Sequence, residues 1–216
     1  MRGLIDKDIR LLLKRKQTLI LFLGIVIVMS LMTPGEMLVG YFSFLIVILI
    51  VGTISYDEFD NGTAFLMSLP ISRKLYVQSK YLLCIIGELS AWAIGFCIYV
   101  LSGFIRKVPV NIGEELPTIA IMIPIVMLMV DVLLPIQLKF GMEKSRVVMA
   151  TFCVVVAVII YVSYNYSLSG AAVDDIIATI NAISPSVYLI VGFVLFILVT
   201  YLSYIISVKV IKKKEY

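Results

Sequence analysis

The chain has 216 residues, of which 62% are hydrophobic and 15% are charged, and its formal net charge is +4. Apolar runs long enough to span a bilayer recur along it, which excludes a soluble globular protein, since a span needs roughly 20 apolar residues. Histidine, the commonest general base and metal ligand, is absent, and the three cysteines lie inside apolar runs without disulfide or zinc spacing.

The amino-terminal segment, residues 1–17, holds six of the 18 basic residues. Lys7, Arg10 and Lys14 share one helical face, while apolar residues such as Ile9 share another. This spacing predicts an amphipathic helix that lies on an anionic membrane surface before the chain enters the bilayer. A plain basic start that sets the topology is the alternative, and the two are compatible.

Six apolar runs are predicted to form membrane-spanning helices. They cover about residues 18–32, 38–55, 81–105, 117–138, 147–164 and 188–208. No small-residue cleavage site follows the first run, so we expect it to be retained. The fourth run contains Pro124 and Pro135 and is expected to be kinked. No external loop is long enough for an extracellular domain, so the chain is expected to be one all-α transmembrane domain.

The distribution of basic residues predicts the orientation of these spans. Sixteen of the 18 lysines and arginines lie in the amino-terminal segment, in residues 56–80 and 139–146, and in the carboxy-terminal tail. Arg106 and Lys107, in a short polar loop, are the other two. The positive-inside rule therefore places both termini and both of these loops in the cytoplasm.

The loop between the second and third runs, residues 57–76, is predicted to hold a short helix outside the bilayer. Acids are expected in its first turn, where carboxylates interact favourably with the positive helix end. These acids are Asp57, Glu58 and Asp60. An apolar stripe follows at helical spacing, made of Phe65, Leu66 and Leu69. Such an element is suited to binding by a partner protein.

Pro70 and Ser72 mark the end of this element. Proline cannot continue a helix, and Ser72 can cap the next one, whose first turn brings Arg73 and Lys74. The same residues also fit an ordinary interfacial linker that packs its Phe and Leu side chains on lipid headgroups.

Two blocks of sequence are the most specific in the chain. The first comprises Asn61, Gly62, Phe65, Leu66, Ser68, Leu69, Pro70, Ser72, Arg73, Tyr76, Val77, Lys80 and Tyr81. The second comprises Pro135, Lys139, Phe140, Gly141, Glu143, Lys144, Ser145 and Arg146. They resemble, in order, the first and second cytoplasmic loops of bacterial ABC-2 type transporter permeases. More narrowly, they resemble the small permeases of phenol-soluble-modulin exporters, and the resemblance covers most of the chain.

The resemblance implies an ABC-2 fold of the type V exporter kind, with an elbow helix over 1–17 and a coupling helix in the 57–76 loop. The coupling helix would seat in a cleft of an ABC ATPase. The residues implied in that contact are Asp57, Glu58, Asp60, Asn61, Gly62, Phe65, Leu66, Ser68, Leu69, Pro70 and Arg73. The second loop would add Lys139, Phe140, Gly141, Glu143, Lys144 and Arg146.

The chain contains no Walker A pattern, and no cytoplasmic segment is large enough for a nucleotide-binding domain. We therefore expect it to be no enzyme and to bind no cofactor or metal, and the resemblance implies that two copies of a separate ATPase hold ATP and Mg²⁺. The resemblance also implies a second permease subunit, identical or a paralogue, in a bacterial cytoplasmic membrane. The expected cargo is an amphipathic peptide or similar hydrophobic substrate, moved among membrane lipids, and no nucleic acid is expected to bind.

Two acids, Glu88 and Asp131, lie inside apolar runs, where a charge is costly to bury. At 1.5 Å per residue, both are roughly 10–12 Å from the cytoplasmic ends of their helices and are level if the helices adjoin. One hypothesis is a polar patch on the transport pathway or a proton relay. The alternative is a structural acid that is protonated, hydrogen-bonded or paired with a lysine from the cytoplasmic rim.

A second functional hypothesis is a proton- or cation-coupled secondary transporter that uses Asp131 and Glu88. Against it, the most patterned blocks lie in cytoplasmic loops, where an autonomous transporter needs no special sequence. Tyr201 and Tyr204 are expected to form an interfacial belt or to pack against neighbours, with a groove for amphipathic cargo as the alternative.

Overall fold

The computed structural model describes residues 1–32, 37–58, 62–107, 112–165 and 185–214, and these are helical with short connections. The helices are α1 (Arg2–Lys14), α2 (Lys16–Met32), α3 (Met37–Val51), α4 (Thr53–Glu58), α5 (Gly62–Ser68), α6 (Arg73–Arg106), α7 (Ile112–Ala120), α8 (Met122–Asn165) and α10 (Pro185–Lys213). The described residues contain no strand, which confirms the predicted all-α class.

The amino-terminal segment forms a separate helix, as its periodicity predicts. α1 ends at Lys14 and is followed by Arg15, and α2 begins at Lys16 as an apolar helix of 17 residues. Leu4 and Asp8 are the buried residues of α1. The basic residues Arg10 and Lys14 are exposed, so α1 presents its charged face outward while its buried face packs on the bundle.

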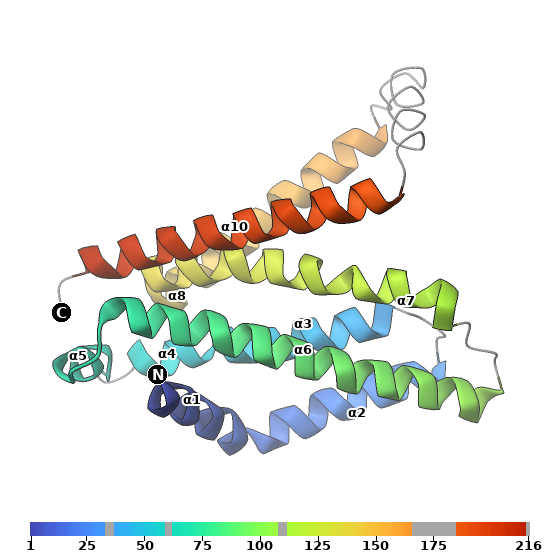
Figure 1. The fold of residues 1–216 in the computed structure, drawn as a ribbon, viewed down its shortest axis with the longest axis horizontal. Helices are drawn as coiled ribbons and strands as arrows, with labels where there is room; N and C mark the ends of the chain where they lie inside the picture. The colour runs from blue at the N-terminus through green and yellow to red at the C-terminus, as the bar shows by residue number, and fades with distance from the viewer. Residues whose placement is uncertain (33–36, 59–61, 108–111, 166–184, 215–216) are drawn as a thin grey trace.

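The helices lie roughly side by side, and Figure 1 shows their order across the bundle. α1 and α2 are on one side, α3 and α6 are in the middle, and α8 and α10 are on the other side. α6 packs most closely on α3, and α8 packs most closely on α10. The main core cluster joins these helices through apolar side chains such as Val47, Val77 and Leu134, all of which are buried.

Small residues on α6 allow its close approach to α3. Gly87, Ala91 and Gly95 repeat every fourth residue and therefore share one helical face. A Cβ atom at Gly87 would lie 2.0 Å from the Cδ1 atom of Ile50, and one at Gly95 would lie 3.3 Å from the Cα atom of Val39. The two backbones pack at distances that larger side chains would prevent, as small residues allow in membrane helices.

α8 consists of two helical segments that meet at Gly141. The φ and ψ angles there are 73° and −177°, a conformation open to glycine but not to residues with a Cβ atom. The chain changes direction at this bend, and the second segment leads away from the bundle (Figure 1). The bend falls between the predicted fourth and fifth spans, whereas Pro135 lies within the helix.

Four helical segments are long and apolar enough to cross a membrane, among the residues that the structure describes. They are Met37–Glu58, Arg73–Arg106, Glu115–Gly141 and Val194–Lys213, and they match the predicted second, third, fourth and sixth spans. The first predicted span corresponds to the shorter apolar helix Lys16–Met32. The fifth falls in the second segment of α8, where most side chains lie outside the described set, so six spans remain a prediction.

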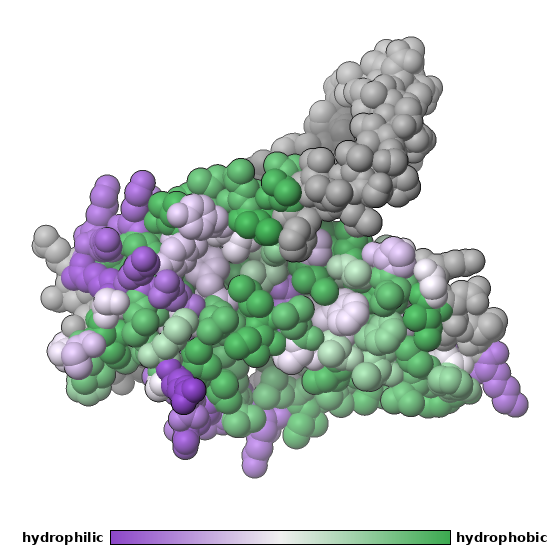
Figure 2. Space-filling view, in the orientation of Figure 1, coloured by the Kyte–Doolittle hydropathy of each residue, from purple (hydrophilic) through white to green (hydrophobic). Residues whose placement is uncertain are grey.

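Both termini lie at the same end of the bundle as α5 (Figure 1). Hydrophilic side chains gather at this end, while apolar side chains cover most of the middle of the visible face (Figure 2). We call this end the basic end, because the lysines of the carboxy-terminal tail lie there with the 62–80 segment and the Gly141 bend. The arrangement agrees with the predicted grouping of basic segments on one side of a membrane.

Candidate functional site

The second sequence block lies at the basic end against the end of α4, which directly precedes the first block. A Cβ atom at Gly141 would lie 3.0 Å from Oε2 of Glu58, which shows how closely the bend approaches the end of α4. About one helical turn earlier in both segments, the Gln137 side chain donates a hydrogen bond of 2.9 Å to Ser55 Oγ. The carboxy-terminal tail joins them, because Lys214 Nζ lies 3.3 Å from Glu58 Oε1.

The short helix α5 is the most prominent element of this end. It stops at Ser68, before Pro70, and Ser72 caps α6 by accepting a 3.2 Å hydrogen bond from the Leu75 amide. Both features confirm the predictions that the short helix ends before Pro70 and that Ser72 caps the next helix. Phe65 is 67% exposed, whereas Leu66 packs partly against the main core cluster. Within the predicted apolar stripe, Phe65 therefore faces outward and Leu66 faces the core.

The prediction that Asp57 and Glu58 lie in the first turn of this short helix is wrong. Both belong to α4, because the helix through the second apolar run continues to Glu58 after a turn at Gly52. Asp60 and Asn61, also expected in the ATPase contact, lie outside the described residues. Thr63 Oγ1 donates a 2.7 Å hydrogen bond to the Asp57 carbonyl and so ties α5 back to α4.

Asp57 belongs to a buried charge cluster, which consists of Asp8, Asp57 and Lys80 together with the partly exposed Lys7. Lys80 Nζ lies 2.7 Å from Asp8 Oδ2 and 2.8 Å from Asp57 Oδ2. Lys7 pairs with Asp57, and its Nζ atom is 3.2 Å from Asp8 Oδ1. The two positive and two negative charges balance, which is the condition under which ions are tolerated away from water.

Neutral hydrogen bonds complete this cluster. The Tyr76 hydroxyl donates a 2.9 Å bond to Asp57 Oδ2, and Lys80 Nζ donates a 3.2 Å bond to Thr53 Oγ1. The side chains come from α1, α4 and the first turns of α6. The cluster therefore holds both ends of the α5 loop to each other and to the amino-terminal helix.

Sequence reasoning missed Asp8 and Lys80 as members of this cluster. Asp8 lies four residues after Leu4 and four before Leu12, so it falls on the apolar face of α1. Lys80 is similarly four residues from Tyr76 and from Cys84, both of which are buried. A charged residue lies within an apolar helical face at both positions. This pattern could have indicated from the sequence that the two charges are buried and paired.

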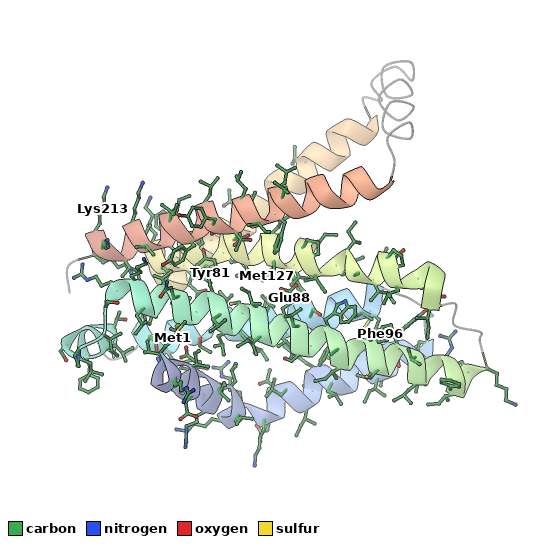
Figure 3. The ribbon with its side chains drawn as sticks, in the orientation of Figure 1. Met1, Tyr81, Glu88, Phe96, Met127 and Lys213 are labelled. Atoms are coloured by element: carbon green, nitrogen blue, oxygen red, sulfur yellow. The ribbon has the colours of Figure 1, made fainter. Side chains whose placement is uncertain are left out.

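Glu88 and Asp131 are both buried, at 1% and 4% exposure. Thr200 donates a 2.8 Å hydrogen bond to Asp131 Oδ2, and Ser203 donates one of 2.5 Å to the Asp131 carbonyl. Glu88 lies where α6 passes α8 (Figure 3). The other carboxylate oxygens, Glu88 Oε1 and Asp131 Oδ1, have no hydrogen-bond partner among the described residues.

A groove of about 660 Å³ opens beside Asp131, between α6, α8 and α10. Thr200 lines it together with the rings of Tyr81, Tyr201 and Tyr204. The Tyr81 hydroxyl is 2.6 Å from Ser203 Oγ, and its ring meets that of Tyr204 edge to face at 5.9 Å. Tyr201 and Tyr204 of α10 thus line a groove. From the sequence, an interfacial belt or packing was expected for them, and a groove was the alternative.

These features define a class of protein before any comparison. A bundle with four helices of membrane-spanning length and buried acids between them is a multi-pass membrane protein. The sequence model of the ABC-2 family of transporter proteins matches residues 3–212, and the chain belongs to this family. Membership makes it a membrane transport subunit that is not itself an ATPase and implies association with an ABC ATPase. Comparison with curated proteins and with solved structures finds no significant match.

Proposed function

We propose that this chain is the permease subunit of an ABC exporter and that α5 is the element by which its ATPase drives it. The observation that carries the proposal is the exposed Phe65 on a short helix at the basic end. A large aromatic side chain exposed among polar groups is the usual anchor of a protein interface. The docking surface would comprise α5 and the Gly141 bend, including Lys139 and Phe140.

The buried charge cluster supports this role, because it provides a mechanical connection from α5 to the spans. Asp57 precedes α5 and Lys80 follows it, and their 2.8 Å contact closes the loop. A displacement of α5 by the ATPase would therefore act on α4 and α6 together. Asp8 adds α1 to the same connection.

The proposed assembly contains two permease subunits, identical or paralogous, and two ATPase subunits that bind ATP and Mg²⁺ in a bacterial cytoplasmic membrane. The proposed cargo is an amphipathic peptide or a similarly hydrophobic molecule. The 660 Å³ groove supports this choice, since its lining combines apolar side chains such as Phe196 and Met127 with polar residues such as Gln78 and Tyr201. A peptide with one apolar and one polar face matches such a surface.

Replacement of Phe65 by alanine tests the docking role. We expect Phe65→Ala to reduce co-purification of the ATPase by at least tenfold and to stop transport, because interface anchors contribute about 2 kcal/mol or more. The matched control is Phe104→Ala, since Phe104 is 77% exposed at the opposite end of the bundle. Both variants should keep the thermal stability of the parent in detergent. Full ATPase recovery and transport by Phe65→Ala would exclude α5 as the coupling helix.

The second candidate, a proton- or cation-coupled transporter, is favoured by one observation. Glu88 and Asp131 each keep a buried carboxylate oxygen without a partner among the described residues. Such an oxygen is available to a proton or cation. Family membership favours the ATP-driven mechanism, and the two candidates predict different behaviour for a variant at Asp131.

A further inference from the structure

A second groove, of about 440 Å³, lies at the basic end between α8 and α10. Three lysines line it: Lys139 from α8, and Lys209 and Lys213 from α10. Its remaining lining is apolar and includes Pro135, Ile136 and Ile206. None of the described residues that line this groove is acidic.

The three lysines are exposed, and they differ from other lysines of this end, which pair with acids. Lys7 and Lys80 pair with aspartates, and Lys214 pairs with Glu58. Within the described part of the chain, no carboxylate pairs with Lys139, Lys209 or Lys213. The Lys139 ammonium group lies 4.8 Å from the ring centroid of its neighbour Phe140. Three lysines that pair with no carboxylate of the described residues therefore border one groove.

Polarity changes along the groove in the same direction on both helices. On α10, Ile206, Lys209 and Lys213 follow at spacings of three and four residues and share one face. On α8, Pro135 and Ile136 lie in the apolar span, and Lys139 follows toward the basic end. The groove is thus apolar along the membrane-spanning part and cationic at its end, where lipid headgroups lie.

We propose that this groove binds an anionic phospholipid, with its phosphate between the three lysines and an acyl chain along Pro135, Ile136 and Ile206. Basic pockets between membrane helices suit such headgroups, and each lysine near an anionic membrane surface contributes about 1 kcal/mol. A soluble acidic partner would use only the charges, whereas a lipid fills both parts of the groove. The groove shares Lys139 and Phe140 with the proposed ATPase docking surface. Lipid binding is therefore measured on the permease without its ATPase, so that its outcome is distinct from that of the export proposal.

Native mass spectrometry of the full chain in mild detergent, titrated with phosphatidylglycerol or phosphatidylcholine, tests the site. The triple variant Lys139→Gln, Lys209→Gln, Lys213→Gln should lose affinity for phosphatidylglycerol by roughly 100-fold, at about fivefold per lysine. Its matched control is Lys16→Gln, Lys74→Gln, Lys107→Gln, which removes three exposed lysines outside the groove and outside the basic face of α1. The control should retain the affinity of the parent, and phosphatidylcholine should bind all three proteins equally weakly.

A further variant, Ile206→Trp, tests the apolar half of the groove without a change of charge. Ile206 is exposed, so a larger side chain can be accommodated there while occupying the acyl-chain path. We expect it to weaken phosphatidylglycerol binding about tenfold or more. Equal losses in the two lysine triples would show diffuse surface charge and overturn the site. Unchanged binding in Ile206→Trp, or full competition by millimolar inorganic phosphate, would reduce it to a simple anion site and also overturn the proposal.

Discussion

Lys80 Nζ lies 2.7 Å from Asp8 Oδ2, although the two residues are 72 positions apart in the chain. The contact joins the amino-terminal helix α1 to the first turns of α6, which directly follow the proposed coupling loop. Both side chains are almost fully buried. When one of them is removed, water therefore cannot solvate the charge that remains on the other.

The first prediction concerns Lys80, whose removal leaves two buried aspartates with only the partly exposed Lys7 as a positive partner. Lys80→Met should destabilise the protein by about 3–5 kcal/mol, because a buried ion without its partner is strongly unfavourable. The measurement is the apparent melting temperature in mild detergent. Lys74→Met, at an exposed position of the same helix, should leave that temperature nearly unchanged. In the double variant Asp8→Leu, Lys80→Met the pair Asp57 and Lys7 remains balanced, and part of the stability should return.

The second prediction concerns Gly141, where φ is 73° and a Cβ atom would approach Glu58. Gly141→Ala should cost about 1–3 kcal/mol, because essentially only glycine adopts a φ of 73° with a ψ of −177°, and it should shift the bend away from α4. We expect a lower melting temperature together with weaker ATPase recovery. Gly113→Ala is the control, since nothing lies within 4 Å of its added Cβ atom and its φ is not positive. Identical behaviour of the two variants would contradict this account of the bend.

The third prediction concerns the close packing of α6 on α3. Gly95→Leu should destabilise the bundle by about 1–3 kcal/mol, because its side chain would push against the Val39 backbone. Gly24→Leu, on α2, adds the same side chain where nothing lies within 4 Å of the Cβ atom, so it should be tolerated. Thermal unfolding of both variants in the same detergent compares them. Equal melting temperatures would show that α6 does not need the small residue.

The fourth prediction separates the two functional candidates at Asp131. Asparagine keeps an oxygen that accepts the hydrogen bond from Thr200 but cannot carry a charge or release a proton. In an ATP-driven exporter, Asp131→Asn should keep transport within about threefold of the parent. The assay uses proteoliposomes that contain the permease and its ATPase, with ATP and without a pH gradient. Transport driven by a pH gradient alone, and lost in Asp131→Asn, would instead establish the proton-coupled candidate.

Much of the fold follows from local patterns of sequence. The long apolar runs correspond to helices of spanning length, and the breaks at Pro70 and Ser72 fall where these residue types place them. Two predicted spans are exceptions: the first forms the shorter apolar helix Lys16–Met32, and most side chains of the fifth lie outside the described residues. The exposure of Phe65 is compatible with the docking role that the family resemblance implies.

The sequence by itself determined the all-helical membrane class, the exposed connection between the second and third apolar runs, and the lack of an ATPase motif. These depend on hydrophobicity, helix-breaking residues and short motifs, which are properties of neighbouring residues. Only the tertiary structure decided that Asp57 pairs with Lys80 and Lys7, and that Gly141 adjoins Glu58. Such pairings depend on which helices pack together and at what rotation, and residues far apart in the chain carry no local signal of that choice.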